Sequence, residues 1–114
     1  MTNSVSEEAG KLVVKLTGDI DLEHAPKVRE LLLDCVGRGK DVVVDFTGVT
    51  YIDSSGVANL VEALQSANRQ ETDFQLVSVT DQAMRVLQLA RLEKVFAIHD
   101  DLAAAVGAAV GAAA

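Results

Sequence analysis

Two hydroxyl side chains and a carboxylate meet at one junction of this 114-residue chain. Residues 42–64, VVVDFTGVTYIDSSGVANLVEAL, begin as an apolar strand pattern and change to a helical pattern at Asp53, Ser54, Ser55 and Gly56. Asp and Ser are favoured N-cap residues, so these residues can simply start a helix. A hydroxyl there can also carry a phosphate, because the N-terminus of a helix favours an anion. Phosphate on Ser55 would add about −1.5 to −2 charges to a docking surface, and Gly56 would let a kinase or partner backbone approach closely.

Asp19, Asp21, Asp45 and Asp53 form a second group of candidate residues. Such acids could make a phosphoacceptor pocket like that of a response-regulator receiver, and VVVDF is similar to the strand that carries a receiver's phosphoacceptor aspartate. A receiver has two helices between its acidic pair and that aspartate, whereas the pattern here predicts one helix between Asp21 and Asp45. Because such motifs need their structural context, we reject the receiver interpretation and expect no metal site.

His24, His99 and Cys35 complete the residues that could do chemistry. Their spacing is not that of metal ligands, and Cys35 lies on an apolar helix face where core packing explains it. The sequence contains no Ser-x-x-Lys, no Gly-x-Ser-x-Gly and no glycine-rich phosphate loop, and its acids show no acid–base pair. We therefore expect neither an enzyme nor a bound cofactor.

Composition restricts the kinds of partner. The net charge is −7, from 17 acidic and 10 basic residues, and aromatic residues make up 4% of the chain. A nucleic-acid surface needs the opposite charge and stacking aromatics, and an anionic membrane surface would repel the chain. A basic protein partner fits better, because complementary charge speeds encounter. The single cysteine, the N-terminal residues without a signal-peptide pattern and the lack of an apolar span lead us to expect a cytoplasmic protein without membrane insertion.

The elements that must position the junction are strands alternating with helices. We predict strands at residues 11–18, 41–46, 74–79 and 95–98, an edge strand at residues 4–6, and a loop at residues 47–51. Helices are predicted from about Pro26 to Gly37, from Ser54 to Arg69, after Thr80 and after Asp100. On the helix from Ser54, we expect Ala58 and Asn59 to face outward, where small residues permit a flat partner interface.

This alternation predicts an α/β fold with a mainly parallel or mixed sheet. We expect one domain over residues 1–114, with residues 1–10 partly ordered and the Ala-rich residues 111–114 frayed. In such sheets, binding sites gather at the carboxyl ends of strands. The two loops at such ends contain GDIDLEHAP and TYIDSSGV.

Three stretches together resemble the STAS domain, which is shared by sulfate transporters and bacterial anti-sigma factor antagonists. They are LTGDIDLEHAPKVRELL, VVVDFTGVTYIDSSGVANLVEAL and LARLEKVFAIHDDLAAAV, and the resemblance extends from about Lys11 to Val110. It implies a mixed sheet of four to five strands with about four helices, mainly on one side. It also implies that Ser55 is the phosphorylated serine, with Asp53, Ser54 and Asp21 beside it.

The resemblance implies a partner-switching mechanism for a single-domain anti-sigma factor antagonist. The unphosphorylated protein would bind an anti-sigma factor that is also a serine kinase, and the sigma factor would be released. Phosphorylation of Ser55 would abolish that binding, and a metal-dependent serine phosphatase would restore it. The alternative is a constitutive accessory subunit of a lipid-transport ABC system that binds the transporter ATPase, with Ser55 as a helix cap only.

Overall fold

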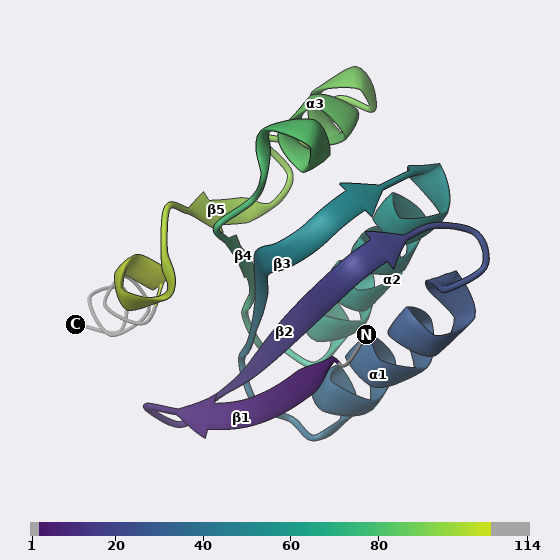
Figure 1. The fold of residues 1–114 in the computed structure, drawn as a ribbon. Coiled ribbons are helices and arrows are strands. Elements are labelled where there is room, and N and C mark those ends of the chain that lie inside the picture. The colour runs from purple at the N-terminus through teal and green to yellow at the C-terminus, as the bar shows by residue number, and fades with distance from the viewer. Residues whose placement is uncertain (1–2, 106–114) are drawn as a thin grey trace.

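The structure, a computed structural model, describes residues 3–105 and consists of one mixed sheet with helices packed on it. Its elements are β1 (Ser4–Glu8), β2 (Lys11–Ile20), α1 (Ala25–Gly37), β3 (Val42–Ile52), α2 (Ser54–Arg69), β4 (Phe74–Val77), α3 (Asp81–Leu89) and β5 (Ala97–His99), followed by a helical turn at residues 102–105. The strand order is β1-β2-β3-β4-β5, with β1 antiparallel to β2 and all other neighbours parallel (Figure 1). The predicted α/β fold and the predicted N-terminal edge strand are confirmed.

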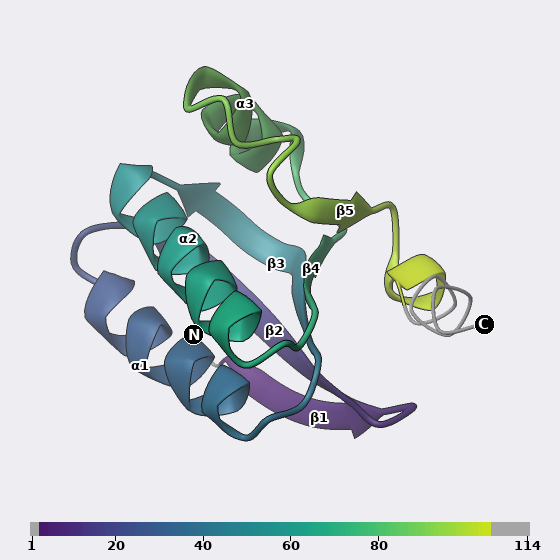
Figure 2. The same ribbon diagram turned by 180° about the vertical axis from the view of Figure 1, so that it is seen from behind.

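The helices α1 and α2 lie together on one face of the sheet (Figure 2). This agrees with the rule that connections between parallel strands are right-handed. Each new strand is added on the same side of the previous one, so right-handed crossovers cover the same face. The turn at residues 102–105 packs on the other face, where Ala105 meets Val43 and Val77. Helices therefore lie mainly, but not entirely, on one side.

Alternation along the strands builds the core. Side chains of β2, β3 and β4 that point toward the helices are almost fully buried; they are Leu12, Val14, Leu16, Val42, Val44, Phe46, Phe74 and Leu76. The inward face of α1 contributes Val28, Leu32 and Cys35 to the same cluster. Cys35 is buried as expected, and burial raises the pKa of its thiol.

One prediction was wrong at the place that matters for the site. Residues 47–51 are not a loop, because β3 continues to Ile52 and pairs with β2 through Thr17–Gly48, Gly18–Val49 and Asp19–Tyr51. Two register shifts interrupt this pairing, so the outward and inward side chains do not alternate regularly. The β-branched residues of TGVTY favour a strand, but the irregular pattern conceals it.

The remaining elements agree with the predictions within a few residues. α2 spans Ser54–Arg69 as predicted, and the hydroxyl of Thr80 caps α3 by accepting the Ala83 N–H at 3.2 Å. β4 ends at Val77 because Ser78 has a φ of +53°. The predicted fraying of residues 111–114 lies outside the described residues. Among residues 3–105, no helix is long and apolar enough to cross a membrane.

Candidate functional site

The candidate site lies where β2 and β3 end side by side. The backbone N–H of Asp53, just after β3, donates to the carbonyl of Ile20, the last residue of β2, at 3.2 Å. This bond brings the loop after β2 next to the junction (residues 53–56) that starts α2. The two loops that the sequence places at strand ends therefore share one end of the sheet, as expected for parallel strands.

Asp53 is the residue that caps α2. It has extended backbone angles, and its Oδ1 accepts the N–H of Ser55 at 2.9 Å and that of Gly56 at 3.3 Å. This is the standard geometry of an N-cap carboxylate, which satisfies N–H groups that the helix leaves free. The capping interpretation of the junction is thus confirmed for Asp53.

The two serine hydroxyls are not needed for the cap. Ser54 is exposed and Ser55 is half-buried, both on the first turn of α2. Within the described part of the chain neither hydroxyl takes part in a hydrogen bond, although the Ser55 N–H is held by Asp53. The Ser55 hydroxyl is therefore not engaged by the cap, although its backbone N–H is fixed at the helix N-terminus.

Asp21 is fixed by the residues that follow it. Its Oδ1 accepts from Nδ1 of His24 at 2.7 Å and from the His24 backbone N–H at 3.1 Å. The hydrogen bond from the His24 ring lowers the pKa of the Asp21 carboxyl, and the N–H groups of His24 and Glu23 add to this effect. Asp21, Glu23 and His24 each have one potential metal-ligating atom, a carboxylate oxygen or a ring nitrogen, and these three atoms lie within 4.8 Å of one another. Because Asp21 and His24 bind each other, this group is a folded turn with an ionised carboxylate beside the junction.

The four acids of the sequence do not form one pocket. Asp19 accepts from the Thr50 hydroxyl at 2.6 Å and lies at the same end of the sheet as Asp21 and Asp53. Asp45 is buried farther down β3, where it accepts from the backbone and hydroxyl of Thr47. Seven residues of strand lie between Asp45 and Asp53, which corresponds to roughly 25 Å. The rejection of a receiver-like pocket agrees with this geometry.

Gly56 corrects one expectation. It is buried, and a Cβ there would lie 2.6 Å from Cγ1 of Ile52 and 2.7 Å from Cγ2 of Ile20. The space that glycine leaves is therefore filled by side chains of this chain and not by a partner's backbone. Its role is to let the first turn of α2 pack against the ends of β2 and β3.

Asn59 corrects a second expectation. Its side chain is not on the partner-facing side: it is only 7% exposed, and its Nδ2 donates to the carbonyl of Ala25 at 2.7 Å. This bond joins α2 to the start of α1, so a polar residue that looks outward by helical position is satisfied inside the protein. Ala58 is exposed, as predicted.

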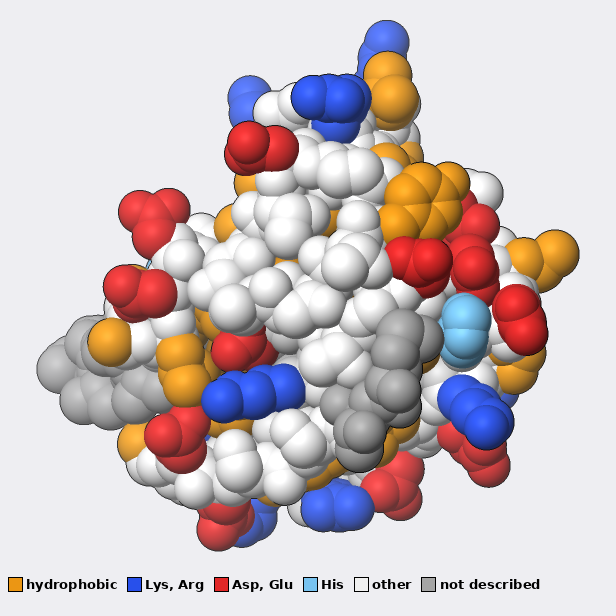
Figure 3. Space-filling view, in the orientation of Figure 1, with side chains coloured by type: hydrophobic (Ala, Val, Ile, Leu, Met, Phe, Trp, Pro, Cys, Tyr) orange, Lys and Arg blue, Asp and Glu red, His pale blue; other side chains and the backbone are white. Residues whose placement is uncertain are grey.

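Two apolar side chains near the junction were missed by the sequence reasoning. Leu22, one residue after Asp21, is 76% exposed, and Tyr51, two residues before Asp53, is 43% exposed. Figure 3 shows acidic and hydrophobic side chains next to one another at the end of the molecule where β2 and β3 finish. Leu22 stands between two acids in DLE, which was an available signal, whereas Tyr51 has Thr50 and Ile52 as neighbours and its local sequence carries no such signal.

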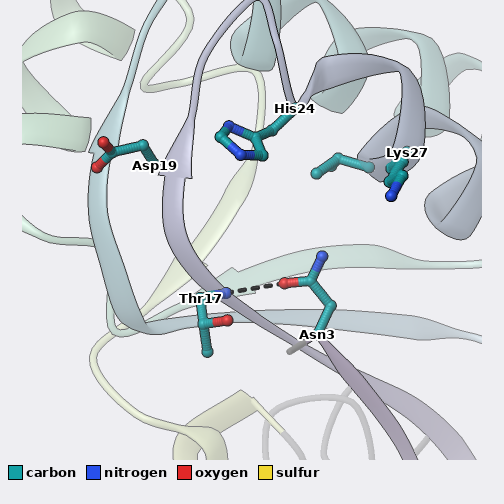
Figure 4. Close-up of a pocket in the computed structure, with 6 residues that line it drawn as sticks. Asn3, Thr17, Asp19, His24 and Lys27 are labelled. Atoms are coloured by element: carbon teal, nitrogen blue, oxygen red, sulfur yellow. Dashed lines mark hydrogen bonds between the residues drawn. The ribbon is translucent and has the colours of Figure 1, made fainter. Parts of the chain in front are cut away.

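A hollow of about 340 Å³ lies beside the loop after β2. Figure 4 shows His24 and Lys27 of the α1 side opposite Asp19 and Thr17 of β2, with Asn3 accepting the Thr17 N–H at 2.9 Å. The lining carries both a carboxylate (Asp19) and an ammonium group (Lys27), so its charge is mixed and does not select an anion.

Comparison with known proteins agrees with this geometry. Residues 3–105 match the model of the STAS domain. An anti-sigma-B factor antagonist of Listeria monocytogenes is 31% identical over 86 residues, which is 75% of each chain. The crystal structure of an anti-sigma factor antagonist from Mycobacterium paratuberculosis has a TM-score of 0.85 at 26% identity, covering 94% of this chain and 92% of that one. The Bacillus cell fate determinant SpoIIAA in its phosphorylated form has a TM-score of 0.68 at 16% identity, covering 90% and 96%.

The sheet order, the junction after β3 and these matches define the class of the protein. The chain belongs to the STAS domain family.

Proposed function

We propose that this protein is an anti-sigma factor antagonist controlled by phosphorylation of Ser55. The observation that carries the proposal is that the helix cap at the junction is made by Asp53 and not by a serine hydroxyl. Asp53 supplies the helix cap, which leaves the Ser55 hydroxyl free at the N-terminus of α2. Relatives with this function, and the existence of a phosphorylated form of a protein with the same fold, support the proposal.

The unphosphorylated site would bind an anti-sigma factor that is also a serine kinase. The acids Asp19, Asp21 and Asp53 give the surface a negative charge, and Leu22 and Tyr51 give it apolar contact area. A partner surface with basic groups around apolar recesses fits this arrangement, because complementary charge steers encounter and buried apolar side chains provide affinity. Ala58 adds a flat position on the first turns of α2.

Phosphorylation would switch this binding off. A phosphate on Ser55 adds about −1.5 to −2 charges to a surface that already carries the side chains of Asp19, Asp21 and Asp53. Docking would then require desolvation of a dianion, and a shift of a few kcal/mol changes occupancy by orders of magnitude. A metal-dependent serine phosphatase would remove the phosphate. In this mechanism the protein, in the cytoplasm with its sigma factor, is a substrate and a ligand of other proteins and not a catalyst.

The test is mass spectrometry of the protein purified from its host, with and without phosphatase, followed by binding to the purified kinase partner. We expect phosphate on Ser55, wild-type or tighter binding by Ser55→Ala and at least about tenfold weaker binding by Ser55→Asp, with Ser54→Ala as the matched control. If no phosphate is found across growth and stress conditions and Ser55→Asp binds as wild type, the switch is wrong. A transporter ATPase recovered as the constitutive partner would then favour the accessory-subunit alternative.

A further inference from the structure

The end of β3 is held by a side chain from a distant helix. Oε1 of Gln82 accepts the backbone N–H of Ile52 at 2.9 Å, and Nε2 of Gln82 donates to the backbone carbonyl of Ile52 at 2.9 Å. One primary amide thus satisfies both backbone groups of the residue that precedes Asp53. In an antiparallel pair of strands, the N–H and C=O of one residue of the neighbouring strand would make the same two bonds.

Gln82 occupies a place that no strand fills. β4 pairs with β3 only as far as Asp45, so the second half of β3 has β2 on one side and no strand on the other. Ile20 accepts from Asp53, and in a parallel ladder this means that the groups of Ile52 point away from β2. Without Gln82, they would be two unpaired groups in a partly buried position.

Gln82 itself is firmly placed. It lies on the first turn of α3, whose N-terminus is capped by Thr80 and whose Ala83 and Leu87 are buried in the core. On the other side of the bond, the Ile52 side chain touches the space above Gly56. A continuous set of contacts therefore runs from α3 through Gln82 and Ile52 to the first turn of α2.

We propose that Gln82 is a positioning residue for the phosphoacceptor site and that it transmits the charge state of Ser55 to α3. This rests on the proposed function, in which Ser55 receives the phosphate. The exposed side of α3, with Asp81, Arg85 and Leu89, would then differ between the two states of the protein. A partner that touches α3 would distinguish these states without contacting the phosphate.

Backbone amide NMR and hydrogen exchange on the full chain test the proposal. Gln82→Met keeps the length of the side chain but removes both bonds, and we expect the protection of the Ile52 amide to fall at least about tenfold. Gln88→Met, at an exposed position of the same helix, is the matched control and should leave this amide unchanged. Equal protection of the Ile52 amide in both variants would show that Gln82 does not hold the end of β3.

A double-mutant comparison tests the transmission. In the wild-type background, Ser55→Asp should shift the amide resonances of residues 83–85, and in the Gln82→Met background these shifts should disappear. The same shifts in both backgrounds, or none in the wild type, would overturn the proposal. These NMR measurements need no kinase. If Ser55 is not phosphorylated in the host, the proposed function is contradicted, but the role of Gln82 is still decided by the amide shifts.

A third variant covers a Gln82→Met protein that fails to fold. In Gln82→Glu the ionised carboxylate lacks the donor for the Ile52 carbonyl, whereas the protonated carboxyl has one donor and one acceptor like the amide. We expect its Ile52 protection factor, corrected for intrinsic exchange, to rise as the pH falls through the pKa of the new carboxyl. A protection factor without this pH dependence would contradict the paired bond.

Discussion

The two halves of β3 do different work within one strand. Residues 42–46 are buried on both faces and pair with β2 and β4, whereas residues 47–52 pair with β2 alone, through two register shifts, and are largely exposed. Burial on both faces and pairing on both sides are typical of a core strand in a parallel sheet. The second half carries the junction and the acids around it. The comparison shows that a site with accessible polar groups was obtained by extending a core strand beyond its neighbour.

The largest effect should separate two aromatic residues of this strand. Phe46, fully buried, and Tyr51, 43% exposed, lie on the two halves. We expect Phe46→Ala to reduce the free energy of unfolding by about 3–5 kcal/mol, through loss of buried area and a residual cavity, and Tyr51→Ala to change it by no more than about 0.5 kcal/mol. Urea denaturation measures both. Similar losses would mean that the second half is part of the core.

The next effect concerns the packing that fixes the start of α2. Gly56→Ala places a methyl group against Ile52 and Ile20, so we expect a loss of about 1–3 kcal/mol in the free energy of unfolding. Gly37→Ala, at a helical position with nothing within 4 Å of the new methyl group, should be neutral or stabilise the protein by up to about 1 kcal/mol. Thermal unfolding of the pair decides this. A tolerated Gly56→Ala would show that the junction can shift.

A smaller effect should identify the capping residue. Asp53→Ala removes the acceptor for two N–H groups and should cost about 1 kcal/mol of stability, whereas Asp53→Asn keeps an acceptor and should cost less. Ser54→Ala should leave stability unchanged, because its hydroxyl is not used by the helix. If Ser54→Ala loses as much stability as Asp53→Ala, Asp53 is not the sole capping residue.

The smallest effect is the pH dependence of Asp21. Its pKa lies below the ordinary value of 3.8 because of His24, so its contribution to stability is fully present above the pKa of the unfolded chain and is lost as the pH falls through the lower folded value. A carboxyl ¹³C NMR titration should give the lowered pKa in the wild type and a value closer to 3.8 in His24→Ala. His99→Ala is the control. An unchanged titration in His24→Ala would remove His24 as the cause.

The same comparison explains what the sequence could predict. Residues 42–46 form a nearly continuous apolar run, and Ser54–Arg69 has a clear helical period, so the first half of β3 and the whole of α2 were predicted, although the end of β3 was missed. Thr47–Tyr51 lacks either period because the strand shifts register there, and pairing with Thr17–Asp19 is not a local property. The junction was recognisable as a helix cap from its residue types, but these did not choose Asp53 over Ser54.

The errors at the site have a common physical cause. Gly56 was assigned to a partner surface because it lacks a side chain, and Asn59 because of its place along the helix. Each lies against a residue more than thirty positions away in the chain, Ile20 for Gly56 and Ala25 for Asn59. Gln82 was not considered at all, since its bonds join residues 30 positions apart. Such contacts depend on how the layers pack, which periodicity does not contain.

The consecutive strand order has a consequence for biosynthesis. Every strand joins the sheet beside the strand that precedes it in the chain, so the sheet can grow in the order in which the ribosome releases it. The β1–β2 hairpin comes first, and β3 then supplies Asp53 next to Ile20. Gln82 leaves the ribosome some thirty residues later, so the nascent chain can form the junction at residues 53–56 before Gln82 is present to bind Ile52.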